Sequence, residues 1–509
     1  MKLNINNQHI SLRQLRSAWE SPVQIGLGDD ARKAVANAQA EVNKVLASGD
    51  SVYGVNTGFG QLAKIRISND ELTLLQENLV RSHAVGVGEP LPDAIVRLVM
   101  VMKVIGLARG YSGVRPELID TLCDLLNHEI YPLIPAKGSV GASGDLAPLA
   151  HMAGLLIGFG EAGYKGELMP ASDALAAAGL EPLKLAPKEG LALLNGTQVS
   201  TALTLAALFR AEHVLSASLA SGALSADAIK GSDTPFDERI HAVRGHASQI
   251  AVAETLRTLM QGSDIRASHI DCNRVQDPYS IRCQPQVIGA CLAAIEHAGG
   301  VLETEANAVT DNPLVFAESD AILSGGNFHA EPVAMVADYL AVAIAEIGSL
   351  SERRIALLID SHLSELPAFL VADSGINSGF MMAQVTAAAL VSENKTLAHP
   401  ASVDSIPTSA NQEDHVSMAT FAGRRLHEML DNVDHVVAIE LLAATQGVEF
   451  HRPQKSSALL EKAMQQVRGV SAPYDEDRSL SPDIQALAKE IDAGEFCQYA
   501  SAILPSFVE

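Results

Sequence analysis

The sequence predicts a mainly α-helical protein: a long-helix bundle with a smaller mixed N-terminal region that carries a loop of small residues. Two observations predict this fold class. From about residue 190 onward, long stretches rich in Ala and Leu have apolar residues on almost every face of a helix. The 509 residues are 48% hydrophobic but only 4% aromatic, so small aliphatic side chains have to fill the core, which favours closely packed helices. We expect an N-terminal region over residues 1–190, and a helical bundle with a C-terminal cap over 191–509.

The N-terminal region is expected to combine short strands with helices. Residues 3–5 and 9–12 have β-like character, and Gly-rich loops follow them. Residues 70–83 are predicted to form a helix because leucines recur there at spacings of three and four, on one helical face. Residues 94–107 are predicted to form another.

The bundle is expected to contain interior helices. A helix that is apolar on every face needs neighbours on every face, from its own chain or from another subunit. Two uncharged stretches, 190–209 and 374–392, are expected to be buried helices rather than membrane spans, because each contains Asn and Gln, which are costly in lipid. Ser481-Pro482-Asp483 indicates the start of a helix in the cap. The long segments expected to be helical are 203–219, 287–307, 331–353, 381–397, 417–430 and 433–444.

Composition limits the possible classes of function. The formal net charge of −24 argues against a nucleic-acid partner, which requires a basic surface. The five cysteines are an odd number without CxxC spacing, so we expect reduced thiols and neither a zinc site nor a disulfide framework. The N-terminus lacks the apolar core of a signal peptide. These features predict a cytoplasmic protein without a membrane partner.

The loop Gly141-Ala142-Ser143-Gly144-Asp145 is the most informative segment. Gly144 has no Cβ, so its amide nitrogen can approach a neighbouring carbonyl in a geometry that other residues resist. Attack of that nitrogen on the carbonyl carbon of Ala142, loss of water and dehydration of Ser143 would give a five-membered ring with an exocyclic methylidene. No ordinary side chain supplies such an electrophile. An isolated Ala-Ser-Gly tripeptide is more often only a turn, so the surrounding sequence decides.

The surrounding sequence resembles the aromatic amino acid ammonia-lyases. Residues 138–151 are similar to the prosthetic-group loop of that family, and the resemblance is closer still to its histidine-specific branch. It implies a self-made 4-methylidene-imidazol-5-one (MIO) group from Ala142, Ser143 and Gly144, with no external cofactor or metal. It also implies a homotetramer whose active sites combine residues of more than one subunit. Five further blocks follow the family's order along the chain, at 53–60, 194–198, 276–286, 325–329 and 409–415.

The resemblance implies elimination of ammonia from L-histidine to give trans-urocanate. This reaction needs an electrophile that makes the nitrogen leave and a base for the weakly acidic Cβ proton. The resemblance makes Tyr53 the catalytic base or acid, and places Tyr279 beside the prosthetic group, where it could assist proton transfer. A phenol has a reference pKa near 10, so that pKa has to be lowered in the enzyme. Which tyrosine removes the proton stays open.

Other residues are expected to bind the substrate. The Arg282 guanidinium suits a carboxylate, which it can bind bidentately, although an Arg also often forms an ordinary ion pair. By resemblance, Asn195 and Gln276 are the amides that hold the prosthetic group and the substrate backbone; buried amides also often only satisfy loop carbonyls. Phe328 would pack near the substrate, or else belongs to the core.

His83 and Glu413 are expected to decide which amino acid is the substrate. In the phenylalanine branch the position of His83 is apolar, and an acidic residue at the position of Glu413 is also foreign to that branch. A carboxylate favours an imidazole, which can donate N–H groups to it. Tyrosine-specific relatives also use a histidine near His83, which could equally be a core histidine. Asp145 follows the ring-forming triplet; it either assists cyclisation, as the resemblance implies, or caps the next helix.

Three alternatives remain from the sequence. One is the same chemistry on tyrosine, or a 2,3-aminomutase that returns ammonia to Cβ. Another is a non-catalytic helical assembly protein in which the loop never cyclised. The third is a lyase of the argininosuccinate/fumarase type, although the Met-Pro-x-Lys-x-Asn loop of that group is absent here.

Overall fold

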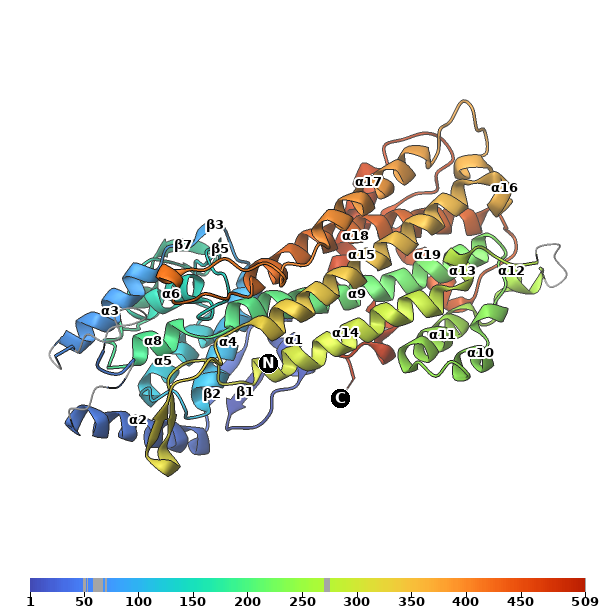
Figure 1. The fold of residues 1–509 in the computed structure, drawn as a ribbon. Coiled ribbons are helices and arrows are strands. Elements are labelled where there is room, and N and C mark those ends of the chain that lie inside the picture. The colour runs from blue at the N-terminus through green and yellow to red at the C-terminus, as the bar shows by residue number, and fades with distance from the viewer. Residues whose placement is uncertain (49–51, 53, 58–66, 69–70, 270–274, 509) are drawn as a thin grey trace. The chain divides into compact units, whose positions relative to one another are not determined.

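The computed structural model describes residues 1–48, 52, 54–57, 67–68, 71–269 and 275–508 (Figure 1). Helices dominate it and the strands are short, which confirms the predicted fold class. The chain divides into two compact units. Unit 1 comprises Met1–Ala206, Gly300–Asp338 and Pro400–Arg424, and unit 2 comprises Ala207–Gly299, Tyr339–His399 and Arg425–Glu509. The expected boundary at residue 190 stays a prediction. In the structure, two later segments, 300–338 and 400–424, belong to unit 1.

Unit 1 contains every strand among the described residues, arranged in four small sheets. The sheet of β1 and β2 is parallel, with Lys2 opposite Gln24 and Ile5 opposite Leu27. The other pairs, β3–β5, β4–β6–β7 and β8–β9, are antiparallel. The strands are β1 (Lys2–Ile5), β2 (Gln24–Leu27), β3 (Val87–Pro90), β4 (Tyr131–Pro132), β5 (Pro135–Lys137), β6 (Glu161–Tyr164), β7 (Glu167–Pro170), β8 (Leu314–Phe316) and β9 (Ala321–Leu323).

The prediction of a strand at residues 9–12 is wrong. Ser11 is the N-cap of a helix that begins at Leu12, and its side chain accepts a hydrogen bond from the backbone N–H of Gln14. The Gln14 side chain in turn accepts from the Ser11 backbone N–H, which completes a capping box. Because this local capping satisfies donors that a helix start leaves open, it overrides the weak alternation of apolar residues.

In unit 1, the helix α4 (Asp93–Ala108) is buried along almost its whole length. The predicted helices at 70–83 and 94–107 are confirmed by α3 and α4. The other helices that lie entirely in unit 1 are α1 (Leu12–Glu20), α2 (Asp29–Ser48), α3 (Leu72–His83), α5 (Pro116–Asn127), α6 (Leu146–Leu156), α7 (Ala171–Ala177), α8 (Glu189–Leu194), η4 (Ala317–Ser319) and η6 (Ser409–Asn411).

Four long helices have residues in both units: α9 (Gln198–Ala228), α14 (Gln284–Ala306), α15 (Glu331–Ile359) and α18 (Ala419–Glu449). In α9 every residue except Arg210 is buried, as expected for an interior helix. The remaining elements of unit 2 are η3 (Thr234–Phe236), α10 (Glu238–Ala242), α11 (Ala247–Met260), α12 (Asp264–Ala267), α13 (Tyr279–Arg282), α16 (Ser361–Ser364), η5 (Ala368–Leu370), α17 (Met381–Leu397), α19 (Ala458–Val470), α20 (Ser481–Asp492), η7 (Cys497–Tyr499) and η8 (Ser501–Ile503).

The segments 417–430 and 433–444 are helical, as expected, but they belong to one helix, α18, which begins at Ala419. The polar pair Asp431-Asn432 between them contains no Gly or Pro to break a helix. One expectation about the bundle is wrong. The stretch 374–392 is not a buried helix: α17 begins only at Met381, and much of its surface in this chain is exposed, including 61% of Met382. Its apolar composition therefore does not reflect burial within one chain.

In the described part of the chain, three helical segments are long and apolar enough to cross a membrane: Glu189–Ala228, Gln284–Ala306 and Glu331–Ile359. The apolar window of the first is wholly buried inside the protein. Its hydrophobicity is thus accounted for by the core, as the sequence predicted for residues 190–209.

Candidate active site

The loop of residues 141–145 lies in unit 1, directly before α6, and its backbone requires glycine at two positions. Gly141 and Gly144 have φ angles of +66° and +73°, in the left-handed region that side chains with a Cβ rarely adopt. A Cβ on Gly144 would lie 2.4 Å from the carbonyl oxygen of Gly196. The Asp145 N–H donates to that same oxygen at 2.8 Å. The loop is thus packed tightly against the turn that follows α8.

The Asp145 carboxylate holds the loop through four hydrogen bonds. Its Oδ1 accepts hydrogen bonds from the hydroxyls of Ser139 at 2.9 Å and Thr420 at 2.7 Å. Its Oδ2 accepts from both the backbone N–H and the hydroxyl of Ser200, at 2.8 and 3.0 Å. The carboxylate is fully buried, and it makes no side-chain capping bond to α6. Asp145 therefore accepts hydrogen bonds from the first turn of α9, where a negative charge is favourable. It also connects the segments that contain Ser139, Ser200 and Thr420.

Asn195 holds the carbonyl of the loop's central residue. Its Nδ2 donates to the Ser143 carbonyl oxygen at 2.6 Å, while its buried Oδ1 has no hydrogen-bond partner among the described residues. The backbone carbonyl of Asn195 accepts a hydrogen bond from the Lys103 ammonium at 3.0 Å, and that of Ala192 accepts from it at 3.2 Å. Burial lowers the pKa of Lys103 to about 7. A buried lysine thus holds the turn that presents Asn195.

Glu413 is far from the loop in the sequence but forms a hydrogen bond with it in the structure. The Ser143 hydroxyl donates to Glu413 Oε1 at 3.3 Å. The second carboxylate oxygen, Oε2, is buried and has no hydrogen-bond partner within the described part of the chain. An antiparallel bridge, in which the Thr408 N–H donates to the Glu413 carbonyl at 2.9 Å, fixes its backbone. One buried carboxylate oxygen is therefore available to a ligand that can donate a proton.

His83 ends α3, and its hydrogen bonding determines its tautomer. Nδ1 lies 2.9 Å from the Leu79 carbonyl oxygen, which can only accept, and 3.1 Å from the Ser82 hydroxyl; the shorter contact favours a hydrogen on Nδ1 and a lone pair on Nε2. Burial lowers the pKa of His83, which favours the neutral ring. Phe328, in the turn before α15, is half-buried in the same unit.

The other predicted residues belong to unit 2, where Gln276 and Arg282 help to line a pocket of about 520 Å³. The Arg282 guanidinium carbon lies 4.4 Å from the ring centroid of Tyr279, a cation–π contact. Tyr279 is 70% exposed, and the buried Nε of Arg282 has no hydrogen-bond partner among the described residues. Tyr53 lies outside the described residues.

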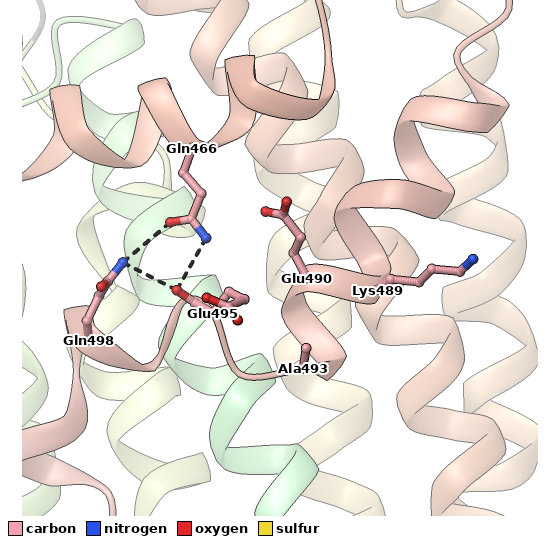
Figure 2. A pocket seen from close by; sticks show the side chains of 6 residues that line it. All are labelled: Gln466, Lys489, Glu490, Ala493, Glu495 and Gln498. Atoms are coloured by element: carbon pink, nitrogen blue, oxygen red, sulfur yellow. Dashed lines mark hydrogen bonds between the residues drawn. The ribbon is translucent and has the colours of Figure 1, made fainter.

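A second pocket of unit 2, of about 450 Å³, contains none of the predicted site residues (Figure 2). Figure 2 shows that amides close one side of it: Gln498 Nε2 donates to Gln466 Oε1 at 3.4 Å, and both amides donate to the Glu495 carbonyl. The Glu490 and Glu495 carboxylates also line this pocket, but none of the predicted site residues does, so we assign it no chemistry.

Comparison with known proteins identifies the kind of site. Residues 10–469 match the model of the family described as aromatic amino acid lyase. The chain belongs to this family. It is therefore a carbon–nitrogen lyase.

Individual relatives of the lyase match over nearly their whole length. The histidine ammonia-lyase of Desulfotalea psychrophila is 58% identical over 507 residues, which are 99% of each chain. Among solved structures, histidine ammonia-lyase from Trypanosoma cruzi has a TM-score of 0.91 and 40% identity, and covers 100% of this chain and 97% of its own. Tyrosine aminomutase from Streptomyces globisporus has a TM-score of 0.92 and 34% identity over 99% of both chains.

The structure of this lyase brings together the predicted residues Ala142, Ser143, Gly144, Asn195 and Glu413, all in unit 1. Gln276, Tyr279 and Arg282 form a second group in unit 2.

Sequence reasoning missed several buried residues that support the first group. Lys103 lies in an apolar helix where the pattern predicts only core, and Ser200 and Thr420 are small polar residues without a motif. An uncompensated lysine inside the apolar stretch 94–107 is the one signal that could have drawn attention to this support.

Proposed function

We propose that this lyase converts L-histidine to trans-urocanate and ammonia, with an MIO group formed from Ala142, Ser143 and Gly144, as a cytoplasmic homotetramer. The proposal rests on two hydrogen bonds of Ser143: its carbonyl accepts from the Asn195 amide, and its hydroxyl donates to the Glu413 carboxylate. Curated relatives named histidine ammonia-lyase are 57–60% identical to this chain. Among solved structures, the histidine ammonia-lyase is 40% identical and the tyrosine aminomutase 34%. This difference supports histidine as the substrate.

The loop residues fit the MIO group. Ring closure requires the Gly144 nitrogen to approach the Ala142 carbonyl, and Gly144 already has a left-handed backbone with no room for a Cβ. The carbonyl oxygen of Ser143 would be the carbonyl of the ring, and the Asn195 amide is hydrogen-bonded to it. When formed, the ring supplies an electrophile that makes the substrate amine able to leave.

The side chains around the loop have distinct roles in this proposal. Asn195 stabilises negative charge on the Ser143 oxygen through a pre-formed hydrogen bond, which costs no reorganisation during the reaction. Asp145 and Lys103 act as positioning residues that do not contact substrate. Asp145 holds the loop, and Lys103 holds the turn that contains Asn195. This arrangement requires an ordered, buried polar network, which the four hydrogen bonds of Asp145 supply.

Substrate choice follows from two acceptors. The free Oε2 of Glu413 accepts an imidazole N–H, and neutral His83 offers the lone pair of Nε2 to a second donor of the substrate. Phenylalanine has no ring N–H, so it would leave the buried Oε2 of Glu413 without a donor. Discrimination against a ligand that lacks the required donor is on the order of 10⁴ in such sites.

The remaining steps use residues outside this cluster. Arg282 binds the substrate carboxylate, Gln276 its backbone, and Phe328 packs against the substrate. Tyr53 or Tyr279 removes the Cβ proton. In the proposed tetramer, the Tyr279–Arg282 helix of one subunit completes the active site of another. The exposure of Tyr279 and the unpartnered Nε of Arg282 support a role for them outside their own chain's core.

The test is the near-ultraviolet absorbance of purified protein mixed in parallel with L-histidine, L-tyrosine and L-phenylalanine. Urocanate formation from histidine alone is expected. Turnover of tyrosine alone would refute histidine specificity and support the tyrosine alternative. The variant Ser143→Ala removes the hydroxyl that dehydration must eliminate without adding bulk, so we expect a folded protein with almost no turnover. Wild-type-like activity of that variant would refute the MIO mechanism.

Intact mass separates a failed substrate assignment from a failed enzyme assignment. A chain lighter by two water molecules contains the ring, whatever the amino acid assay shows. A chain of full translated mass has not cyclised, and the non-catalytic alternative would then hold.

A further inference from the structure

Three potential metal ligands converge in unit 1, on segments that are far apart in the sequence. His329 and Glu331 flank the start of α15, and His415 lies in the segment before α18. One ligand atom from each of the three side chains lies within 4.8 Å of the other two. Small side-chain rotations bring donors at this spacing to the 2.0–2.2 Å bond lengths of a common metal ion.

The hydrogen bonding of His329 prepares its ring for a metal. Nε2 lies 3.3 Å from the backbone carbonyl oxygen of His415. A carbonyl only accepts, so Nε2 carries the hydrogen in this contact and Nδ1 keeps the lone pair. Histidines that bind metals usually donate their other ring N–H to such an acceptor, because this contact fixes both the tautomer and the orientation of the ring. The two histidine rings lie side by side, with centroids 5.6 Å apart.

Glu331 supplies an independent observation. Its Oε2 is buried and has no hydrogen-bond partner in the part of the chain that the structure describes. Leaving a buried carboxylate oxygen without a partner is costly. A bound cation would satisfy it.

We propose that His329, Glu331 and His415 form a binding site for a divalent ion of the zinc type. Two imidazoles and one carboxylate are a ligand set that Zn²⁺ accepts, with a fourth position open to water. Mg²⁺ prefers oxygen ligands only, so the two histidines select against it. Sequence spacing does not reveal this site because the third ligand is 84 residues from the second.

The position of the site connects it to the loop. The N–H of Ala330, between the first two ligands, donates to the Gly141 carbonyl oxygen at 3.2 Å. The hydroxyl of Ser417, two residues after His415, donates to the same oxygen at 3.0 Å. An ion bound to all three ligands would therefore tie together the two segments that hold Gly141. The ion would act on the loop as a clamp, and the proposal assigns it no step in catalysis.

The experiment is calorimetric titration of the full-length, chelator-treated protein with Zn²⁺ and, separately, with Mg²⁺. We expect one Zn²⁺ per chain at this site, an increase in melting temperature with Zn²⁺, and no response to Mg²⁺. The variants His415→Ala and Glu331→Gln should each weaken Zn²⁺ binding at this site at least tenfold and abolish the increase in melting temperature. His362→Ala removes an exposed histidine of unit 2 and should leave both results unchanged.

Equal Zn²⁺ affinity in the wild type and both ligand variants would overturn the proposal, as would the absence of wild-type binding at millimolar Zn²⁺. His415 is exposed and Glu331→Gln is isosteric, so neither substitution should prevent folding; circular dichroism of each variant checks this. The readouts are binding and melting temperature. The result is therefore independent of whether the chain turns over histidine.

Discussion

Lys103, the buried lysine that holds the Asn195 turn, allows a quantitative test of the polar network around the loop. Its ammonium is fully buried in α4 and donates to two backbone carbonyls, at 3.0 and 3.2 Å. Burial disfavours its charge, Asp311 and Asp145 favour it, and Lys188 disfavours it. The net result lowers the pKa of Lys103 from 10.5 to about 7 in the folded protein.

The pKa difference determines how stability changes with pH. Below pH 7 the lysine is protonated in both the folded and the unfolded state, so it contributes no pH dependence. Between about pH 7 and 10.5 the unfolded chain holds one proton more, so raising the pH favours the folded state. The slope for one proton is about 1.4 kcal/mol per pH unit. From pH 8 to pH 10, Lys103 should therefore add about 3 kcal/mol to the free energy of unfolding.

The assay compares urea denaturation of the wild type and Lys103→Met, followed by circular dichroism, at several pH values between 6 and 10. Methionine has a similar length and does not titrate. The difference between wild type and variant should be constant below pH 7 and then rise in favour of the wild type. Lys462→Met, at an exposed position of α19, controls for the loss of a positive charge. Parallel stability curves for the wild type and Lys103→Met would refute the assignment of a neutralised, buried lysine.

Three further predictions concern the loop and the substrate pocket. Gly144→Ala should give a chain of full translated mass, because the new Cβ would lie 2.4 Å from the Gly196 oxygen; a mass loss of two waters would contradict this. Asp145→Asn should lower the free energy of unfolding by about 2–3 kcal/mol, because four hydrogen bonds lose their charged acceptor; an unchanged urea midpoint would contradict it. Glu413→Gln should lower kcat/KM for histidine by roughly 10- to 100-fold, since a hydrogen bond to a charged group contributes about 1.5–3 kcal/mol. Retention of wild-type kcat/KM would remove Glu413 from substrate recognition.

Helix positions were the most predictable part of the fold. The segment 381–397 coincides with α17, and 331–353 lies within α15, because helical periodicity is a local property of the chain. The same pattern could not show that α17 is largely exposed in one chain while α9 is buried on every side. Both helices are rich in Ala and apolar residues, and only their neighbours in space differ.

The sequence by itself determined the helical fold class, the family resemblance and the identity of the loop residues, because composition, periodicity and contiguous motifs are encoded over short distances. Only the tertiary structure decided which distant groups serve that loop. Thr420 reaches Asp145 across 275 positions, and Glu413 reaches Ser143 across 270. The metal ligands His329 and His415 likewise meet only in the folded chain. Such pairs depend on how helices pack, and a local pattern of apolar residues specifies that a face is buried without specifying which residue it meets.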